Sequence, residues 1–184
     1  MDKSKVQGII RELLITLGEN PDRKELKKTP ARVAEMYEKT LSGMKKNAGA
    51  ILQITHDLKH DEMVLIKDVP FYSICEHHLT PFFGKCHVAY IAKNNKIVGI
   101  SRIAELIGTM SKRLQVQERL TTEIANIIMK NLKPKGVGVV IEARHLCLEM
   151  MGHTAPESKI VTSAVRGLFR EDIKTREEFL KLIK

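Results

Sequence analysis

Tryptophan is absent from this 184-residue sequence, other aromatic residues are few, and long apolar segments are missing. Three tyrosines and five phenylalanines offer few rings on which nucleic-acid bases could stack. No apolar run approaches the roughly 20 residues that a membrane-spanning helix requires. Only three cysteines occur, and this odd number argues against a disulfide framework and favours a reducing compartment. The sequence therefore predicts a cytoplasmic protein that neither spans a membrane nor takes nucleic acid as its main partner.

The rest of the composition is that of a globular protein with an excess of positive charge. Apolar residues make up 43% and charged residues 29% of the chain, and the formal net charge is +9. A chain of this length can bury one substantial core. The lysines are spread along the sequence, so the charge suits an anionic small molecule such as a nucleotide. A nucleic-acid binder is the alternative, and its affinity would depend steeply on salt concentration.

Two apolar stripes with helical spacing lie near the start of the chain. Apolar residues recur every three or four positions over 6–17 and again over 33–41. Their simplest role is to form core or subunit contacts. We therefore expect an N-terminal helical segment over 1–58 and a second domain over 59–184.

The period of the apolar residues changes from helical to alternating near Met63. Two hairpins are predicted, with a helix pair between them, and Ser101 is the expected N-cap of that pair's first helix. This order of elements predicts an α+β fold with an antiparallel sheet and the helix pair on one face. The expected strands are 63–70, 86–91, 96–100, 137–150 and 160–169, and the expected helices are 101–110, 116–132 and 175 onwards.

A Cys-Glu-His-His sequence in the middle of the chain contains residue types that bind transition metals. Cys75 and His78 stand three apart, so on a helical turn they face one side and can grip one ion. Cys147 would complete a set of three ligands that zinc prefers, with the fourth position open to water. His77 and His145 would flank that position as imidazoles suited to proton transfer near neutral pH. The residues alone therefore predict a zinc hydrolase.

Other polar residues allow more than one interpretation. Glu118 lies where a solvated helix start would place an acid, since an acid favours the helix dipole. It could instead accept two hydrogen bonds from an amidine-like edge, as guanine presents. Cys86 alternates with apolar strand residues, which is typical of a core thiol.

Several longer motifs occur in one order along the chain. They are Cys-Glu-His-His-Leu-Thr-Pro-Phe at 75–82, Gly-Ile-Ser at 99–101, Arg-Leu-Gln-Val-Gln-Glu-Arg-Leu-Thr at 113–121, His-Leu-Cys at 145–147 and Lys-Thr-Arg-Glu-Glu-Phe-Leu at 174–180. Together they closely resemble the GTP cyclohydrolase I family, from about Thr29 to the C-terminus.

This resemblance implies a tunnelling fold whose sheets join into a barrel on oligomerisation, and a homodecamer with active sites at subunit interfaces. The implied reaction opens the imidazole ring of the guanine of GTP by hydrolysis, releases formate and gives 7,8-dihydroneopterin triphosphate, the first step of pterin and folate synthesis. The implied site residues are zinc ligands Cys75, His78 and Cys147, acid/base groups His77 and His145, Ser101 in the ribose steps, Gln117 and Glu118 at the guanine, and Arg32 and Arg102 at the phosphates.

Departures from the family pattern concentrate where the triphosphate is expected to bind. Arg102 stands where the family usually has lysine, and Glu105 and Met151 stand where it usually has arginine, while Arg32 is kept. A lost charge-assisted hydrogen bond is worth about 1.5–3 kcal/mol, and a carboxylate facing phosphate adds repulsion. Other basic residues could compensate, or the substrate could be a guanine nucleotide or nucleoside with fewer phosphates. A non-catalytic module, with protein filling the fourth zinc position, is a further alternative.

Overall fold

The computed structural model describes residues 1–52, 54–57, 60–153 and 157–184. They form two compact units, Met1–Ser42 and Gly43–Lys184. The division lies earlier in the chain than the domain boundary predicted at 58, because the 3₁₀ turn η1 (Ala48–Ile51) packs against helices of the second unit. The functional assignment of 1–58 as a helical segment and 59–184 as the catalytic domain stays a prediction.

The first unit contains two helices, where the two apolar stripes predict them. α1 covers Lys3–Thr16, and α2 covers Thr29–Thr40, with a proline in its first turn, where the missing N–H costs little. The apolar stripe of α1 is not buried in the single chain: Ile9 and Leu13 are 65% and 49% exposed. Among the described residues, no helix has the length and apolar character needed to cross a membrane.

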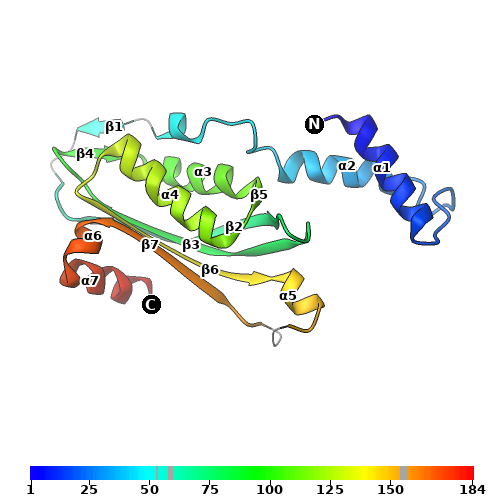
Figure 1. The fold of residues 1–184 in the computed structure, drawn as a ribbon. Helices are drawn as coiled ribbons and strands as arrows, with labels where there is room; N and C mark the ends of the chain where they lie inside the picture. Colours follow the sequence, from blue (N-terminus) through cyan, green and yellow to red (C-terminus); the bar gives the residue numbers. More distant parts are fainter. Residues whose placement is uncertain (53, 58–59, 154–156) are drawn as a thin grey trace. The chain divides into compact units, whose positions relative to one another are not determined.

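The second unit is built on a five-stranded sheet, as the alternating apolar residues predict (Figure 1). The strand order is β5-β2-β3-β6-β7, and all neighbours are antiparallel except the short β5, which pairs parallel with β2. The strands are β2 (Met63–Cys75), β3 (Pro81–Ile91), β5 (Leu114–Gln115), β6 (Gly136–His145) and β7 (Ile160–Gly167).

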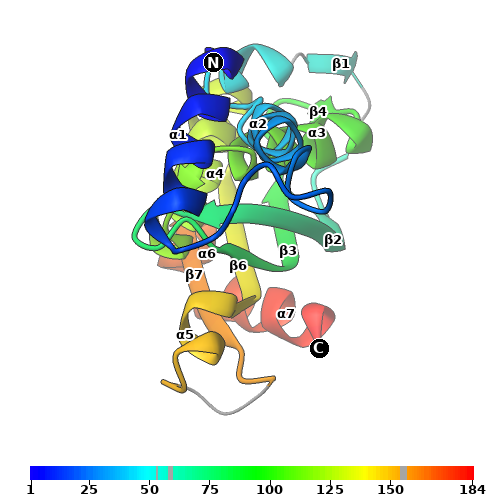
Figure 2. The same cartoon turned by 90° about the vertical axis from the view of Figure 1, so that its right-hand side faces the viewer.

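Helices pack on both faces of this sheet (Figures 1 and 2). On one face, Val88 and Tyr90 of β3 are buried against α3 and α4, which confirms the predicted helix pair. On the opposite face, Ala89 packs with Phe169 and Phe179 of α6 and α7, because successive strand residues point to opposite sides. The helices are α3 (Ile100–Ser111), α4 (Gln117–Leu132), α6 (Leu168–Glu171) and α7 (Ile173–Ile183).

The predicted hairpin over 86–100 is wrong. β4 (Lys96–Val98) pairs with β1 (Ile54–Asp57) in a separate two-stranded sheet. A strand has only two edges, and those of β3 are already occupied by β2 and β6. β4 therefore has no edge of β3 left to pair with.

Element boundaries also differ from the prediction, and β3 begins at Pro81, five residues before the expected start at 86. The strand expected over 137–150 ends at His145 and continues as helix α5 (Leu146–Met150). Ser101 is not the N-cap of α3: the cap is Gly99, and the Ser101 side chain makes no capping bond. β2 continues through Pro70 to Cys75, because at Pro70 it pairs only with β3 and the missing N–H faces no second strand.

Candidate active site

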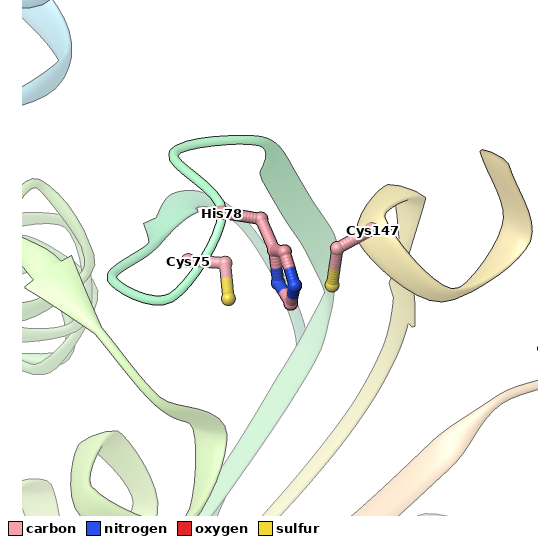
Figure 3. Close-up of side chains that lie close together, drawn as sticks. All are labelled: Cys75, His78 and Cys147. Carbon is pink, nitrogen blue, oxygen red and sulfur yellow. The ribbon is translucent and has the colours of Figure 1, made fainter. Parts of the chain in front are cut away.

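Cys75, His78 and Cys147 lie together at one end of the sheet (Figure 3). Cys75 ends β2, His78 lies in the turn that follows, and Cys147 lies in α5. β3 brings them together because it pairs with both β2 and β6, with Phe82 opposite His145. One ligand atom from each of the three residues lies within 4.8 Å of the other two. The group could therefore hold a metal ion.

The surroundings of these three donors fit a transition metal. Two thiols and one imidazole are donors that such ions take in proteins. Burial and then the adjacent Cys75 raise the pKa of the Cys147 thiol, so two thiolates here need a cation between them. The buried Thr80 hydroxyl has no hydrogen-bond partner of ordinary geometry within the described residues, yet it lowers the pKa of Cys147. A Cys147 thiolate would supply the acceptor that this hydroxyl lacks.

Gln117 holds His145 in one orientation. The Gln117 amide nitrogen donates to the carbonyl oxygens of Ile141 and Ile160, at 3.0 and 2.9 Å, and to Thr162 Oγ1 at 3.1 Å. Its amide oxygen must therefore face His145 Nε2, which lies 2.7 Å away. His145 Nε2 then carries the proton, and Nδ1 is left as the acceptor.

The His145 ring is enclosed on one side by an aromatic ring. It stacks on Phe82 with a centroid separation of 4.8 Å and an interplanar angle of 12°. Burial lowers the pKa of His145, and the negative charge of Glu118 opposes this effect. The net lowering of the pKa favours a neutral imidazole, which can accept a proton.

A cavity of about 270 Å³ adjoins the metal-binding group. It contains most of the site residues predicted from the sequence, including both acid/base histidines and the guanine pair. Its size suits a ring-sized group better than a whole nucleotide. The residues that line it are Cys75, His77, His78, Gln115, Val116, Gln117, Glu118, His145, Cys147, Leu148 and Ile160.

The other predicted site residues lie outside this lining. Ser101 and Arg102 lie exposed at the start of α3. Arg102 Nη1 donates to Glu105 Oε2 at 2.8 Å, so two of the three residues that depart from the family pattern pair with each other. Arg32 lies in α2, within the first unit, and its role stays a prediction.

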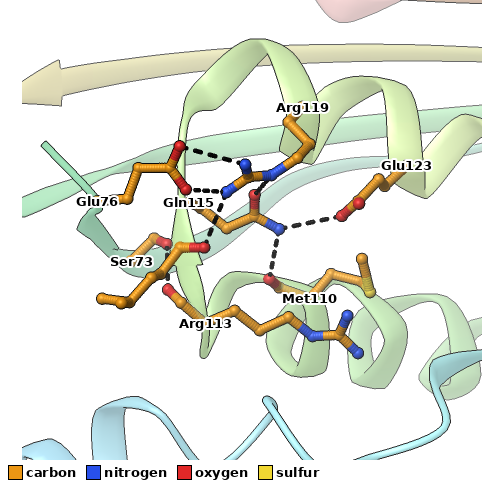
Figure 4. Close-up of polar contacts among 8 residues, drawn as sticks. Ser73, Glu76, Met110, Arg113, Gln115, Arg119 and Glu123 are labelled. Carbon is orange, nitrogen blue, oxygen red and sulfur yellow. Dashed lines mark hydrogen bonds and ion pairs between the residues drawn. The ribbon is translucent and has the colours of Figure 1, made fainter.

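Sequence reasoning missed the contacts behind the site. Glu76 and Arg119 form an ion pair, and the buried Gln115 accepts a hydrogen bond from the same guanidinium (Figure 4). Arg119 lowers the pKa of the Glu76 carboxyl by hydrogen bonding to it. The sequence signal for these contacts was the polar run over 115–119, between the two helices. That run does not show which residues its side chains contact.

Comparison with known proteins finds one matching family model and close relatives over the whole chain. The model of the GTP cyclohydrolase I family matches residues 6–184. GTP cyclohydrolase 1 of Clostridioides difficile (strain 630) is 52% identical over 184 residues, which cover 100% of this chain and 97% of the relative. GTP cyclohydrolase 1 of Pelotomaculum thermopropionicum is 52% identical over 183 residues, with the same coverage. A solved structure, the archaeosine synthase QueF-Like in the apo form, is 16% identical, has a TM-score of 0.48, and matches 57% of this chain and 93% of its own.

Proposed function

The chain belongs to the GTP cyclohydrolase I family, and from this premise we propose that it opens the guanine ring of GTP by hydrolysis. The products are formate and 7,8-dihydroneopterin triphosphate, and the chain is an enzyme with a tunnelling fold. The observation that carries the proposal is the cavity in which two histidines, a carboxylate and the metal-binding group converge. A general acid/base and a nucleophile-activating ion are what hydrolysis of an amidine-type C–N bond requires.

Zinc is the metal that we propose for Cys75, His78 and Cys147. Bound there, zinc supplies Lewis-acid activation of water near neutral pH. Both cysteines are 5% exposed, so the thiolates would be screened from bulk water and from oxidation. Thr80 would donate to the sulfur of Cys147 and stabilise its charged form.

His145 and His77 are the proposed proton-transfer groups. The Gln117 contact leaves His145 Nδ1 able to accept a proton, and burial keeps the imidazole neutral before the reaction. His77 lines the same cavity and is exposed, so it can exchange protons with solvent. Two imidazoles in different surroundings can serve as base and acid in one cycle.

Glu118 is the proposed anchor of the guanine base. It is exposed, in the first turn of α4, and lines the cavity. A carboxylate there can accept two hydrogen bonds from the adjacent N–H groups of guanine, which orients the ring toward the metal-binding group. The Gln117 side chain is occupied with His145, which supports a role in orienting that ring; direct contact with guanine remains the family-based expectation.

The phosphates would bind outside this cavity, because none of the described residues that line it is a lysine or arginine. We propose Arg32 and Arg102 as phosphate contacts and Ser101 for the ribose steps. We also propose a homodecamer with active sites at subunit interfaces, where such residues could come from a neighbouring subunit. The exposed apolar stripe of α1 supports association, since large apolar side chains left in water favour burial.

The function is tested by formate release from the zinc-loaded protein, with GTP, GMP and guanosine compared side by side. We expect formate from GTP at the highest kcat/KM, because triphosphate contacts add binding energy that guanosine cannot supply. A preference for GMP or guanosine would keep the ring-opening reaction and reassign the substrate. The Arg102–Glu105 pair is the observation that favours this second candidate. No formate from any of the three would refute the proposal.

A further expected result concerns Glu105, whose carboxylate pairs with Arg102 and competes with phosphate for it. Glu105→Gln should lower KM for GTP by a factor of about 1.4 to 5, because an exposed ion pair of this kind contributes roughly 0.2–1 kcal/mol. The value for kcat should not change. Asp68→Asn is the matched control, since it breaks a similarly exposed pair with Lys85 that joins β2 to β3 and does not involve α3. An unchanged KM in Glu105→Gln would show that Arg102 does not meet the phosphates.

A further inference from the structure

Arg119 joins the turn that carries the metal-binding residues to the start of α4 (Figure 4). Its Nη1 donates to Glu76 Oε1 at 3.2 Å, and its Nη2 contacts the second oxygen of Glu76. Nη2 also donates to the Leu114 carbonyl at 3.0 Å, and Nε donates to Gln115 Oε1 at 2.9 Å. Every nitrogen of the guanidinium is therefore used on acceptors from the turn and from β5.

The acceptor for Arg119 Nε is held in place by burial. Gln115 is 1% exposed, and its amide nitrogen donates to the Met110 carbonyl at 3.3 Å and to Glu123 Oε2 at 3.2 Å. With its nitrogen committed to these two acceptors, the amide oxygen can only face Arg119. The acceptors on β5 are thus already in place for the guanidinium, and their arrangement suits its planar set of N–H donors.

The other end of this contact is the turn between β2 and β3. Glu76 lies between the metal-binding Cys75 and the pair of histidines, and its backbone N–H donates to the Gln115 carbonyl at 3.0 Å. Within the turn, Leu79 adopts a φ of 54°, a left-handed conformation that a leucine rarely takes without support. The backbone closes the turn itself, with Cys75 N–H donating to the Thr80 carbonyl and Leu79 N–H to the Cys75 carbonyl, both at 2.9 Å. Anchoring Glu76 by both its backbone and its side chain ties this closed turn to β5 and α4.

The helical turn that contains Arg119 also carries two other site residues. Gln117 holds His145, and Glu118 lines the cavity. One short stretch of α4 therefore contacts the metal-binding turn, the buried histidine and the cavity at once. A shift between α4 and the turn would change all three distances together.

We propose that Arg119 is a positioning residue with two effects. Through Glu76 it fixes the distance between the metal-binding turn and the start of α4, which carries Gln117 and Glu118. It also keeps the Glu76 carboxylate away from a bound metal ion. Carboxylates ligate zinc readily, and Glu76 directly follows a cysteine of the metal-binding group. With Arg119 removed, the Glu76 carboxylate would be free to compete as a ligand for a metal ion held by this group. The inference rests on the proposed function, because it assigns Arg119 to the same site.

The test compares Arg119→Ala, Arg119→Lys, Glu76→Ala and the Glu76→Ala/Arg119→Ala double variant. We expect kcat for formate release from GTP to fall about 10- to 100-fold in Arg119→Ala, with a much smaller change in KM. Lysine should restore little, because it cannot make the two-pronged contact. The kcat of the double variant should be no lower than that of the less active single variant, since the two residues act as one unit. Arg11→Ala is the matched control, because it breaks a two-bond pair with Asp22 in the first unit and should keep the parent kcat.

A second readout does not depend on turnover. Zinc-free protein is loaded with Co²⁺, and its visible absorption bands report the number and type of ligands. The parent and Arg11→Ala should share one spectrum, Arg119→Ala should differ, and the double variant, which lacks the freed carboxylate, should return toward the parent. Additive losses of kcat in the double variant, or an unchanged kcat and spectrum in Arg119→Ala, would overturn the proposal.

Two further arrangements keep the test decisive. If Arg119→Ala does not fold, Glu76→Gln replaces it, since it keeps the side-chain shape and removes the charge that Arg119 holds. Its kcat should fall, and an unchanged kcat would count against the proposal. If the parent protein releases no formate from GTP, the proposed function fails, whereas the cobalt comparison still decides whether Arg119 positions the metal-binding turn.

Discussion

Cys147→Ser should lose both the bound zinc and formate release from GTP, with kcat reduced by more than about 100-fold. Loss of a residue that merely supports a metal ligand already costs about 10- to 100-fold, and replacing a ligand should cost more. Serine keeps the size of the side chain but replaces a soft thiolate with a hydroxyl that zinc binds poorly. Metal content after dialysis and formate production in the same preparation are the measurements. Full activity with zinc retained would remove Cys147 from the site.

Cys86→Ala is the matched control for this experiment. Cys86 is fully buried on β3 among the side chains that face α3 and α4, and burial alone raises the pKa of its thiol. It is not part of the group whose ligand atoms lie within 4.8 Å of one another. Cys86→Ala should therefore keep parent zinc content and kcat, with only a modest loss of stability from the small cavity.

His145→Ala should keep its zinc and lose turnover, with kcat reduced about 100- to 10,000-fold. The metal should stay because the ligand group comprises Cys75, His78 and Cys147 and does not include His145. Turnover should fall because the imidazole held by Gln117 beside the cavity is the proposed proton acceptor. Normal turnover in this variant would rule out an acid/base role for His145.

Two other variants test whether the orientation of the ring matters. Gln117→Ala removes the acceptor for His145 Nε2–H, and we expect about a 10-fold loss of kcat with zinc retained. His87→Gln is the control, because His87 is a buried imidazole of β3 that points away from α3 and α4. Within the described part of the chain its one hydrogen bond is accepted from the Asp68 backbone N–H. A glutamine oxygen can accept that bond, so turnover should be unchanged. Equal losses in both variants would indicate a general effect on stability.

The pairing of strands could be predicted from the sequence only in part. Alternation along β3 correctly separates Val88 and Tyr90 on one face from Ala89 on the other, but the predicted helix pair on one face does not reveal that the face of Ala89 is also covered, by Phe169 and Phe179. Alternation does not state which strand lies on each edge of another. The sequence therefore predicts β4 beside β3, whereas in the structure β4 pairs with β1. Which edges are occupied depends on the whole sheet, and residues far apart in the sequence decide it.

Sequence patterns likewise predicted the presence of helices and strands correctly, but they placed some caps and ends wrongly. The apolar stripe of α3 predicts a helix, but Gly99 caps it and Ser101 does not. The strand expected through residue 150 ends at His145, and the turn into α5 brings Cys147 toward Cys75. Sequence periodicity reports which face of an element is buried, and it is weak at element ends, where tertiary contacts choose the boundary.

The sequence by itself determined the family, the alternation and helical stripes that build the core, and the residue types of the metal-binding group. These follow from the spacing of residues that are near one another in the sequence, which can be read without the fold. Only the tertiary structure decided that Gln117 holds His145 and that Arg119 holds Glu76. Each of these polar side chains had several possible partners in the sequence. The packing of α3 and α4 on the sheet selects one, because a buried donor or acceptor must find its partner within hydrogen-bond reach.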